Sequence, residues 1–434
     1  MNMLQTLFGF DKNTMKLRTE LIAGATTFLT MSYILAVNPA ILASTGMDKG
    51  AAFTATALAS AISTLLLALM AKLPFAQALS MGLNAFFAYT LCLAMGYTWQ
   101  QSLAILFVEG ILFILITFFN VRELILNSMP KNLRFAISAG IGMFIAFIGL
   151  KNAEIIVAKP ESTLVGLGAF TPVSILGVIA ILLSGVLMAK KVKGALFYGI
   201  IVTAIVGIPM GVTQISGDWL PVSTPHSIAP ILLNFDFSGL INLQTLMVIF
   251  SLLMVNIFDT VGTLVGLAYK TGIVREDGTI PRVSQAMMSD AIGTTCGACL
   301  GCSTITTYVE SASGIAEGGK SGVTSAVVAG FFLVSLLLSP IFLLIPGAAT
   351  SGALVLVGVL MLDSVKHINL SDVSEAFPAF ITMITMVLCY SIADGICLGI
   401  ISYVVIKLCM LQFKQLNATL VVLAMLFLVN FIFG

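Results

Sequence analysis

Long apolar runs alternate with short polar breaks along almost the whole chain. A helix needs about 20 mainly apolar residues to cross the hydrocarbon core of a bilayer, and this pattern predicts fourteen spans. They cover residues 21–37, 51–71, 79–95, 102–119, 133–150, 173–189, 194–210, 244–268, 284–300, 304–316, 322–345, 351–362, 376–390 and 394–412. A further apolar run, 417–433, is left open as another crossing or a helix packed on the surface of the bundle.

The basic residues indicate how these spans are oriented. If the N-terminus is cytoplasmic, 17 of the 20 Lys and Arg fall in cytoplasmic connections, and only Lys49, Lys151 and Lys159 fall outside. Cytoplasmic loops of membrane proteins carry such an excess of positive charge. We therefore expect a multi-pass protein of the plasma (inner) membrane with a cytoplasmic N-terminus.

Composition supports the same class. Hydrophobic residues make up 59% of the chain and charged residues 9%, against about 25% charged residues in soluble domains, which excludes a soluble globule. A net charge of +1 gives no reason to expect a nucleic-acid partner. Seven cysteines in apolar segments argue against a disulfide framework, and two isolated histidines argue against a metal cluster. No metal or cofactor is expected.

Charged residues inside spans are rare and tend to mark ligand or ion pathways. Asp259 lies in the middle of the eighth span, and Asn256 and Thr263 share one helical face with it because they are spaced at i, i+3 and i+7. A carboxylate buried without a function would be unfavourable. We therefore predict that Asp259 is functional.

Glu310 lies in a Ser- and Thr-rich stretch, residues 301–314, in the tenth span. Irregular backbone at membrane depth is tolerated where it lines a cavity or is buried in protein. The third span, with Asn84 in residues 77–88, has a matching break. Breaks at corresponding positions predict two inverted seven-span repeats with the binding site between their discontinuous third and tenth spans.

The remaining intramembrane acids are less informative. Asp290 fits a coupling role or a structural role at the start of its span equally well, whereas Glu109 and Asp394 are interpreted as structural. Gly293, Gly297 and Gly301 recur every four residues, which predicts a close-packing helix face.

Two motifs match soluble-protein patterns without their structural context. Residues 314–321 fit the P-loop pattern, but they lack the strand that should precede it. Cys296, Cys299 and Cys302 have iron–sulfur spacing but no fourth cysteine nearby. We interpret Lys320 as an anchor of a cytoplasmic loop and the cysteines as packing residues.

From about residue 8 to residue 412 the chain resembles the nucleobase–cation symporters, in particular the AzgA-like adenine/guanine/hypoxanthine permease branch. The stretches that carry the resemblance are 80–87 (SMGLNAFF), 258–266 (FDTVGTLVG), 303–311 (STITTYVES) and 390–396 (YSIADGI). The resemblance implies an all-α membrane protein of fourteen transmembrane segments in two inverted repeats. It also implies a core domain formed by 1–130 and 244–350 and a gate domain formed by 131–243 and 351–434.

The resemblance also implies residue roles. The family's tenth-span glutamate, which hydrogen-bonds the base, falls on Glu310, and its eighth-span acid falls on Asp259. Thr263 stands where other branches carry a coupling histidine. The expected substrate-binding residues are Asn84, Ala85, Phe258, Asp259, Thr263, Tyr308, Val309 and Glu310, and the expected proton-coupling residues are Asp259, Glu310 and Asp290.

These residues predict a secondary transporter that imports adenine, guanine or hypoxanthine by proton symport with alternating access. Glu310 would accept purine N–H groups, backbone amides near Ala85 and Val309 would complete the contacts, and aromatic rings such as Phe258 or Tyr308 would stack on the base. The partners are then purine, protons and lipid, a homodimer is left open, and no catalytic residue is expected.

Two other functions fit these residues less well. An anion carrier of the same architecture is disfavoured, because two carboxylates in the site would repel an anion. An intramembrane aspartyl protease using Asp259 and Asp394 would need Gly-x-Gly-Asp at the second acid, and Ser391-Ile392-Ala393 precedes Asp394 instead.

Overall fold

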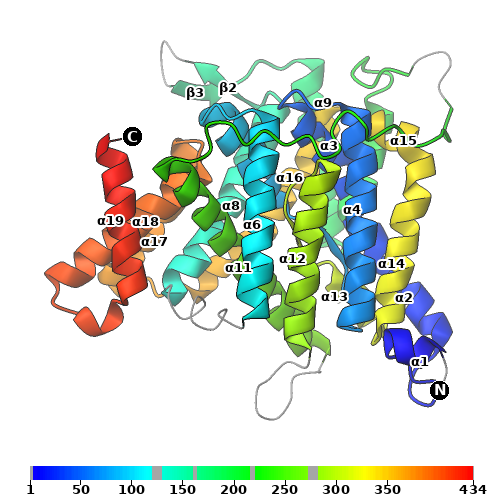
Figure 1. Ribbon diagram of the computed structural model, residues 1–434. Coiled ribbons are helices and arrows are strands. Elements are labelled where there is room, and N and C mark those ends of the chain that lie inside the picture. The colour runs from blue at the N-terminus through cyan, green and yellow to red at the C-terminus, as the bar shows by residue number, and fades with distance from the viewer. Residues whose placement is uncertain (1–2, 120–129, 160–163, 216–219, 272–281, 434) are drawn as a thin grey trace.

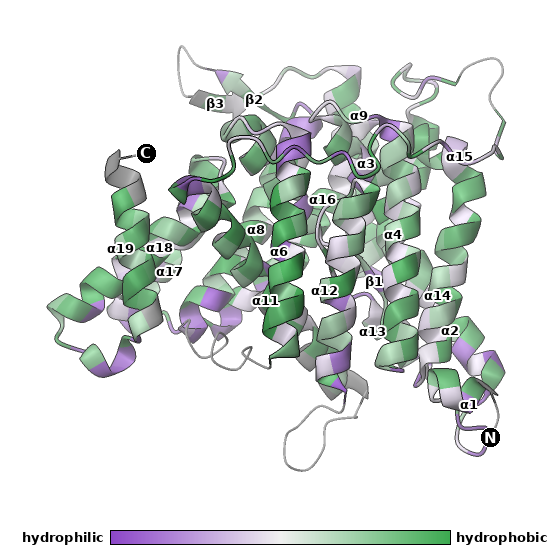
Figure 2. Ribbon diagram, viewed as in Figure 1, coloured by the Kyte–Doolittle hydropathy of each residue, from purple (hydrophilic) through white to green (hydrophobic). Residues whose placement is uncertain are grey.

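The computed structural model describes residues 3–119, 130–159, 164–215, 220–271 and 282–433. Helices run side by side between the face where the N-terminus lies and the opposite face, which carries the hairpin β2–β3 (Figure 1). Hydrophobic residues dominate these helices (Figure 2). In this part of the chain nine helical segments are long and apolar enough to cross a membrane, so the chain is a multi-pass membrane protein.

The first half contains mainly helices. They are α1 (Met3–Phe8), α2 (Leu17–Met31), α3 (Ile34–Ala43), α4 (Lys49–Met70), α5 (Met81–Ala85), the π-helix η1 (Phe86–Ala94), α6 (Trp99–Phe118), α8 (Lys131–Asn152), α9 (Pro172–Ala189) and α10 (Ala195–Val206). Three strands accompany them: β1 (Gln77–Leu79), β2 (Ile156–Lys159) and β3 (Leu164–Leu167).

The second half of the chain is also mainly helical and contains one strand. Its elements are α11 (Leu243–Thr271), α12 (Val283–Leu300), β4 (Ile305–Thr307), α13 (Ser311–Ala316), α14 (Gly322–Ser335), η2 (Leu336–Leu338), α15 (Ser339–Leu343), α16 (Gly347–Met361), η3 (Leu362–His367), α17 (Val373–Leu388), α18 (Ile392–Cys409), η4 (Phe413–Gln415) and α19 (Ala418–Phe433).

The predicted spans 79–95 and 304–316 are discontinuous, as expected. Each consists of a short strand followed by a helical piece, β1 with α5 and η1 in one case and β4 with α13 in the other. The first span is longer than predicted: Leu17–Ala43 forms one hydrophobic segment with a turn at Ser32 and Tyr33 between α2 and α3. The run 417–433 forms α19, which packs against α18 and α11.

Glycines bring neighbouring helices close together. A Cβ atom on Gly358 of α16 would lie 2.4 Å from the carbonyl oxygen of Gly142 on α8, so only glycine fits there. Gly293 of α12 meets α4 in the same way, because its Cβ would lie 2.3 Å from Ser63 Oγ, as the glycine spacing predicted. Gly301 instead ends α12, with φ at +86°.

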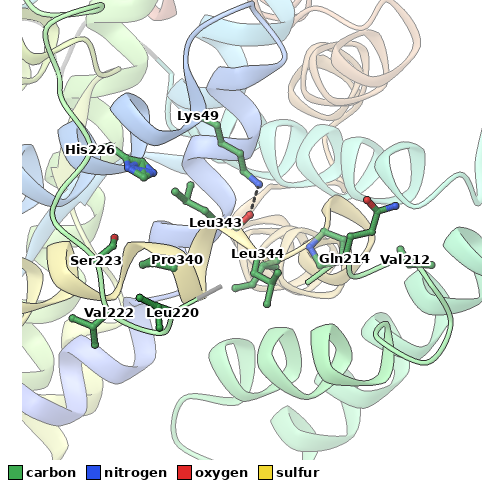
Figure 3. A pocket seen from close by; sticks show the side chains of 12 residues that line it. Lys49, Val212, Gln214, Leu220, Val222, Ser223, His226, Pro340, Leu343 and Leu344 are labelled. Atoms are coloured by element: carbon green, nitrogen blue, oxygen red, sulfur yellow. Dashed lines mark hydrogen bonds between the residues drawn. The ribbon is translucent and has the colours of Figure 1, made fainter. Parts of the chain in front are cut away.

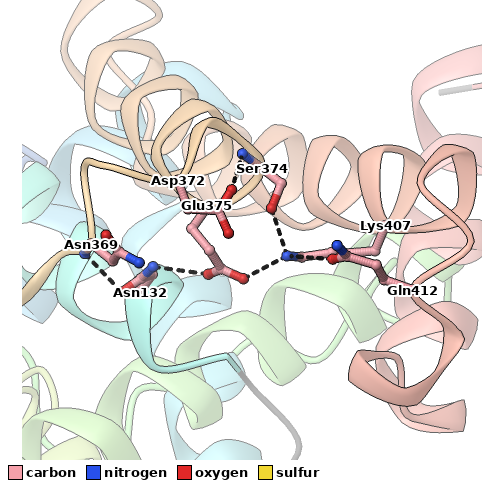
Figure 4. A network of polar contacts seen from close by, with 7 residues as sticks. All are labelled: Asn132, Asn369, Asp372, Ser374, Glu375, Lys407 and Gln412. Carbon is pink, nitrogen blue, oxygen red and sulfur yellow. Dashed lines mark hydrogen bonds and ion pairs between the residues drawn. The ribbon is translucent and has the colours of Figure 1, made fainter.

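A buried cation ties α8, α17 and α18 together near one end of the bundle (Figure 4). Lys407 is 1% exposed, and its Nζ lies 2.8 Å from Glu375 Oε1. Asn132 donates to the other oxygen of Glu375 at 2.9 Å, and Lys407 also donates to Ser374 Oγ and Gln412 Oε1. The lysine is therefore fully paired, which a buried charge requires.

The backbone of the P-loop-like stretch is already occupied. Glu20 of α2 accepts hydrogen bonds from the amides of Lys320 and Ser321 at 3.0 and 3.3 Å and from Thr324 Oγ1 at 2.5 Å. A carboxylate of the protein itself thus takes the place at the start of α14 that a phosphate would need. This agrees with the interpretation of the motif as fortuitous.

Candidate functional site

The two broken spans meet as a two-stranded antiparallel ladder inside the helix bundle. β1 pairs with β4 so that Gln77 faces Thr307, Ala78 faces Thr306 and Leu79 faces Ile305. The Ser80 amide donates to Thr304 O and the Tyr308 amide donates to Ala76 O, both at 2.9 Å, which extends the ladder at each end. The extended backbone is therefore hydrogen-bonded although it lies among helices, as membrane depth requires.

Asp259 comes from α11, and the ladder brings the third span to it. Ser80, the residue before α5, donates from Oγ to Asp259 Oδ2 at 3.1 Å. Thr263 lies one turn further along α11 and is partly buried. Phe258 belongs to the same helix, but its side chain lies outside the described residues.

Glu310 precedes α13, and its carboxylate is held from the first span. Tyr33, which is 2% exposed, donates from its hydroxyl to Glu310 Oε1 at 2.9 Å. Thr30 of α2 hydrogen-bonds Ser313 of α13 at 2.9 Å next to this contact. Asp259 and Glu310 are thus each held by a hydrogen bond at one of the two broken spans, Asp259 by Ser80 and Glu310 by Tyr33.

Tyr308 and Val309 differ in surroundings. The Tyr308 hydroxyl donates to Leu79 O at 2.5 Å, which locks the buried ring onto β1. Val309, between Tyr308 and Glu310, is 58% exposed. The site is therefore open at Val309 and closed by backbone contacts at Tyr308.

Asn84 and Ala85 lie on the buried side of α5. Ser303 donates to Asn84 Oδ1, while Asn84 Nδ2 is buried without an acceptor in the described structure. The Asn84 amide donates to Ser80 O at 2.8 Å and Ala85 ends the helix. The unpaired amide groups of a helix lie in its first turn, so those of α5 precede Ala85.

Asp290 lies behind the ladder, on the side of α12. It is fully buried and accepts hydrogen bonds from Gln77 Nε2 and, at 3.2 Å, from Thr307 Oγ1. Gln77 also donates to Ser289 Oγ at 2.8 Å and accepts from Ser63 Oγ at 2.5 Å. Asp290 thus anchors both strands.

Sequence reasoning missed Tyr33 and Gln77. Tyr33 interrupts an apolar run and belongs to no periodic polar pattern. Gln77 lies at the start of the break in the third span, where Asn84 was the residue singled out. The only sign of these two residues in the sequence is that each is a polar side chain within or beside an apolar span. Their partners are 277 and 213 residues away along the chain, so only the folded chain identifies them.

A pocket lies elsewhere in the described structure (Figure 3). It measures about 710 Å³ and lies between the start of α4, α15 and the segment after α10. Its wall includes Lys49, which donates to Leu343 O at 3.0 Å, and His226. None of the predicted site residues lines it.

Comparisons with known proteins agree with this architecture. The model Xan_ur_permease, described as a permease family, matches residues 18–398. A putative permease of Methanocaldococcus jannaschii is 45% identical over 434 residues, which cover 100% of this chain and 99% of the relative. The adenine permease AdeP of Escherichia coli K12 is 41% identical, with 99% and 96% covered. The guanine/hypoxanthine permease PbuO of Bacillus subtilis is 39% identical, with 98% and 99% covered.

Solved structures share the fold at low sequence identity. The transmembrane domain of the cyanobacterial bicarbonate transporter BicA superposes with a TM-score of 0.66 at 14% identity, covering 88% of this chain and 97% of that one. The murine anion transporter Slc26a9 in its inward-facing state gives a TM-score of 0.65 at 11% identity, covering 94% of this chain and 70% of that one.

Proposed function

The chain belongs to the Xan_ur_permease family of permeases, and we propose that it imports adenine, guanine or hypoxanthine together with protons. The observation that carries the proposal is that an acid lies at each of the two broken spans: Asp259 of α11 accepts a hydrogen bond from Ser80 in the third span, and Glu310 of the tenth span accepts one from Tyr33. Relatives named adenine permease and guanine/hypoxanthine permease align over nearly the full chain, which supports a purine substrate. Membership of this family makes the chain a transporter and not an enzyme.

Purine recognition would centre on Glu310. A carboxylate only accepts hydrogen bonds, so it suits the N–H edge of a purine. Tyr33 holds one of its oxygens and fixes the plane in which the carboxylate meets the base. Asn84 Nδ2 would supply a donor to a ring nitrogen, and amides of the first turn of α5 and near Val309 would complete the contacts.

Proton coupling would follow from the electrostatic interaction of the two acids. Hydrogen bonds from a purine favour the ionised form of Glu310. A proton on Asp259 would remove one of the two negative charges of the proposed site, so the proton and the purine would favour the same loaded state. The coupling is reciprocal and is typically worth about 1–3 kcal/mol. Asp290, which has its own partners in the ladder, would modulate Asp259 as a second acid.

Access would alternate by movement between two domains. We assign the core to 1–130 and 244–350 and the gate to 131–243 and 351–434, with the N-terminus cytoplasmic. An ion pair between Lys193, just before α10, and Glu317, just after α13, joins the gate to the core on the N-terminal face. Such a contact would belong to one state of the cycle and break in the other.

An anion substrate is the second candidate that the fold raises, since its structural neighbours include anion transporters. Two acidic side chains disfavour an anion in this site. The purine is therefore the better match to the chemistry.

Uptake of radiolabelled adenine, guanine and hypoxanthine tests the proposal in cells that lack their own purine carriers. Accumulation of at least one base, faster at acidic external pH, is expected. Absence of uptake of all three, with the protein verified in the membrane, would remove the purine assignment.

The role of Glu310 is tested by Glu310→Gln, which keeps the size of the side chain and removes its charge. We expect purine affinity to fall at least tenfold, because hydrogen bonds to a charged group are worth about 1.5–3 kcal/mol. Glu154→Gln, in an exposed turn, is the matched control. Equal affinity of the Glu310 variant and wild type in a binding assay would exclude Glu310 from the site.

A further inference from the structure

Glu109 is a further buried acid, and no part of the proposed purine site uses it. It lies in the middle of α6 with 0% of its side chain exposed. Asn256 of α11, also 0% exposed, donates from Nδ2 to Glu109 Oε1 at 3.0 Å. This contact connects two helices of the bundle.

Two oxygen atoms of this pair are left without a donor. Glu109 Oε2 and Asn256 Oδ1 are both buried and unpartnered in the described structure. An ionised carboxylate and an amide oxygen are both acceptors only, so neither can satisfy the other. The ion pairs of the described residues involve Glu317, Asp363 and Glu375. No basic side chain among them compensates Glu109, and a buried unpaired charge is strongly unfavourable.

A single proton on Glu109 would give both unpartnered oxygen atoms a hydrogen-bond partner. A protonated carboxyl has one O–H donor beside its remaining acceptor, which matches the donor and acceptor of an amide. Asn256 Nδ2 would donate to Oε1, and the acid O–H on Oε2 would donate to Oδ1. We propose that Glu109 is a proton-binding site, occupied in this state, whose neutral acid is paired with Asn256 through two hydrogen bonds.

No titratable side chain described on the neighbouring helices forms a hydrogen bond with Glu109. α6 packs against α11, α12 and η1. Their described titratable side chains are Asp259 on α11, Asp290, Cys296 and Cys299 on α12, and Tyr89 and Cys92 on η1. Asp259 accepts from Ser80, Asp290 accepts from Gln77 and Thr307, and Cys92 shares a hydrogen bond with Ser102. The other acids therefore have partners of their own.

A proton fits this site better than a metal ion. Hard cations such as Ca²⁺ take six to eight oxygen ligands, whereas the pair offers two unpartnered oxygens. The described residues contain no group of three or more His, Cys, Asp or Glu that could hold a metal.

Infrared spectroscopy of the purified full-length protein, without purine, tests the proposal directly. Wild type should show the carbonyl stretch of a protonated carboxylic acid at neutral pH, and Glu109→Gln should lose one such band. Glu154→Gln should keep it. Glutamine reproduces the donor and acceptor of the neutral acid, so this variant is expected to fold. An unchanged band intensity in Glu109→Gln would show that Glu109 is ionised and would overturn the proposal.

Thermal unfolding as a function of pH gives a second readout. The folded protein holds this proton, whereas a glutamic acid in an unfolded chain is ionised above about pH 4.3. Raising the pH should therefore destabilise wild type relative to Glu109→Gln, so that the difference in Tm grows with pH. A difference that stays constant with pH, or one that follows Na⁺ at fixed pH, would contradict a proton site. Because no purine is present, failure here leaves the proposed transport function untouched.

Discussion

The orientation of the Glu310 carboxylate depends on a tyrosine that lies 277 residues earlier in the sequence. Tyr33 donates to Glu310 Oε1 at 2.9 Å and is itself buried between α2 and α3. The hydroxyl therefore limits the rotation of the acid that we propose to bind the purine. A positioning residue of this kind is expected to affect purine affinity and not the protonation that we propose for Asp259.

Tyr33→Phe should raise the KM for purine about 10-fold or more, because the hydrogen bond to a charged acceptor is lost while the ring is kept. Uptake kinetics measure this effect. Tyr97→Phe is the matched control, since the Tyr97 hydroxyl also has a hydrogen bond, to Thr245 at 2.9 Å, outside the site. A KM unchanged in Tyr33→Phe would remove its positioning role.

Asp259 gives the prediction on pH. Uptake should rise as the external pH falls, because protonation of this acid favours purine binding at Glu310. Asp259→Asn mimics the protonated acid permanently, so pH-driven accumulation should disappear while exchange of purine across the membrane persists. Asp236→Asn, in an exposed loop, is the control, and accumulation that keeps the pH dependence of wild type in Asp259→Asn would argue against the coupling role.

At the scale of the helices, close packing depends on small residues. α8 and α16 approach each other at Gly142 and Gly358, where a Cβ atom would overlap the neighbouring backbone. Backbone cannot yield as a flexible side chain can, so this contact fixes the distance between the two helices.

Gly358→Ala should destabilise the protein by about 1–3 kcal/mol, the usual effect of overpacking, and lower its Tm in detergent. Gly330→Ala on α14 is the control, because a Cβ there meets nothing within 4 Å and alanine favours a helix. Equal melting temperatures of Gly358→Ala and wild type would mean that the α8–α16 contact relaxes freely.

The broken spans show the same dependence on distant partners. β1 and β4 are three residues each and could not persist alone. They are held by one another, by Ser80 and Tyr308 at the ends of the ladder, and by Asp290 and Gln77 behind it. The same ladder places Ser80 against Asp259. It therefore both stabilises the fold and positions a residue of the proposed site.

At the scale of the whole molecule, the Lys193–Glu317 ion pair joins the proposed gate and core. Lys193 is largely exposed, and exposed ion pairs contribute about 0.2–1 kcal/mol. Lys193→Glu or Glu317→Lys should therefore change the uptake rate by a factor between about 1.4 and 5, and the double reversal should restore it. Single variants that match wild type, or a double variant that stays impaired, would separate this pair from the transport cycle.

Several features follow from the order of residues alone. Apolar runs and scarce charges identify a membrane protein because lipid excludes unpaired charge and unpaired backbone. The discontinuous third and tenth spans were also predictable, since Ser, Thr and Asn interrupt otherwise apolar runs. Asp259 and Glu310 stood out for the same reason. The count of fourteen spans stays a prediction.

Folding decided which polar groups meet. No periodic pattern links Tyr33 to Glu310, Gln77 to Asp290, or Glu109 to Asn256, because their partners lie more than 140 residues apart. The energy of a buried acid depends on the donors around it, and those donors come from other helices. Local sequence can therefore mark a residue as unusual, whereas packing determines whether it binds a purine, anchors a strand or holds a proton.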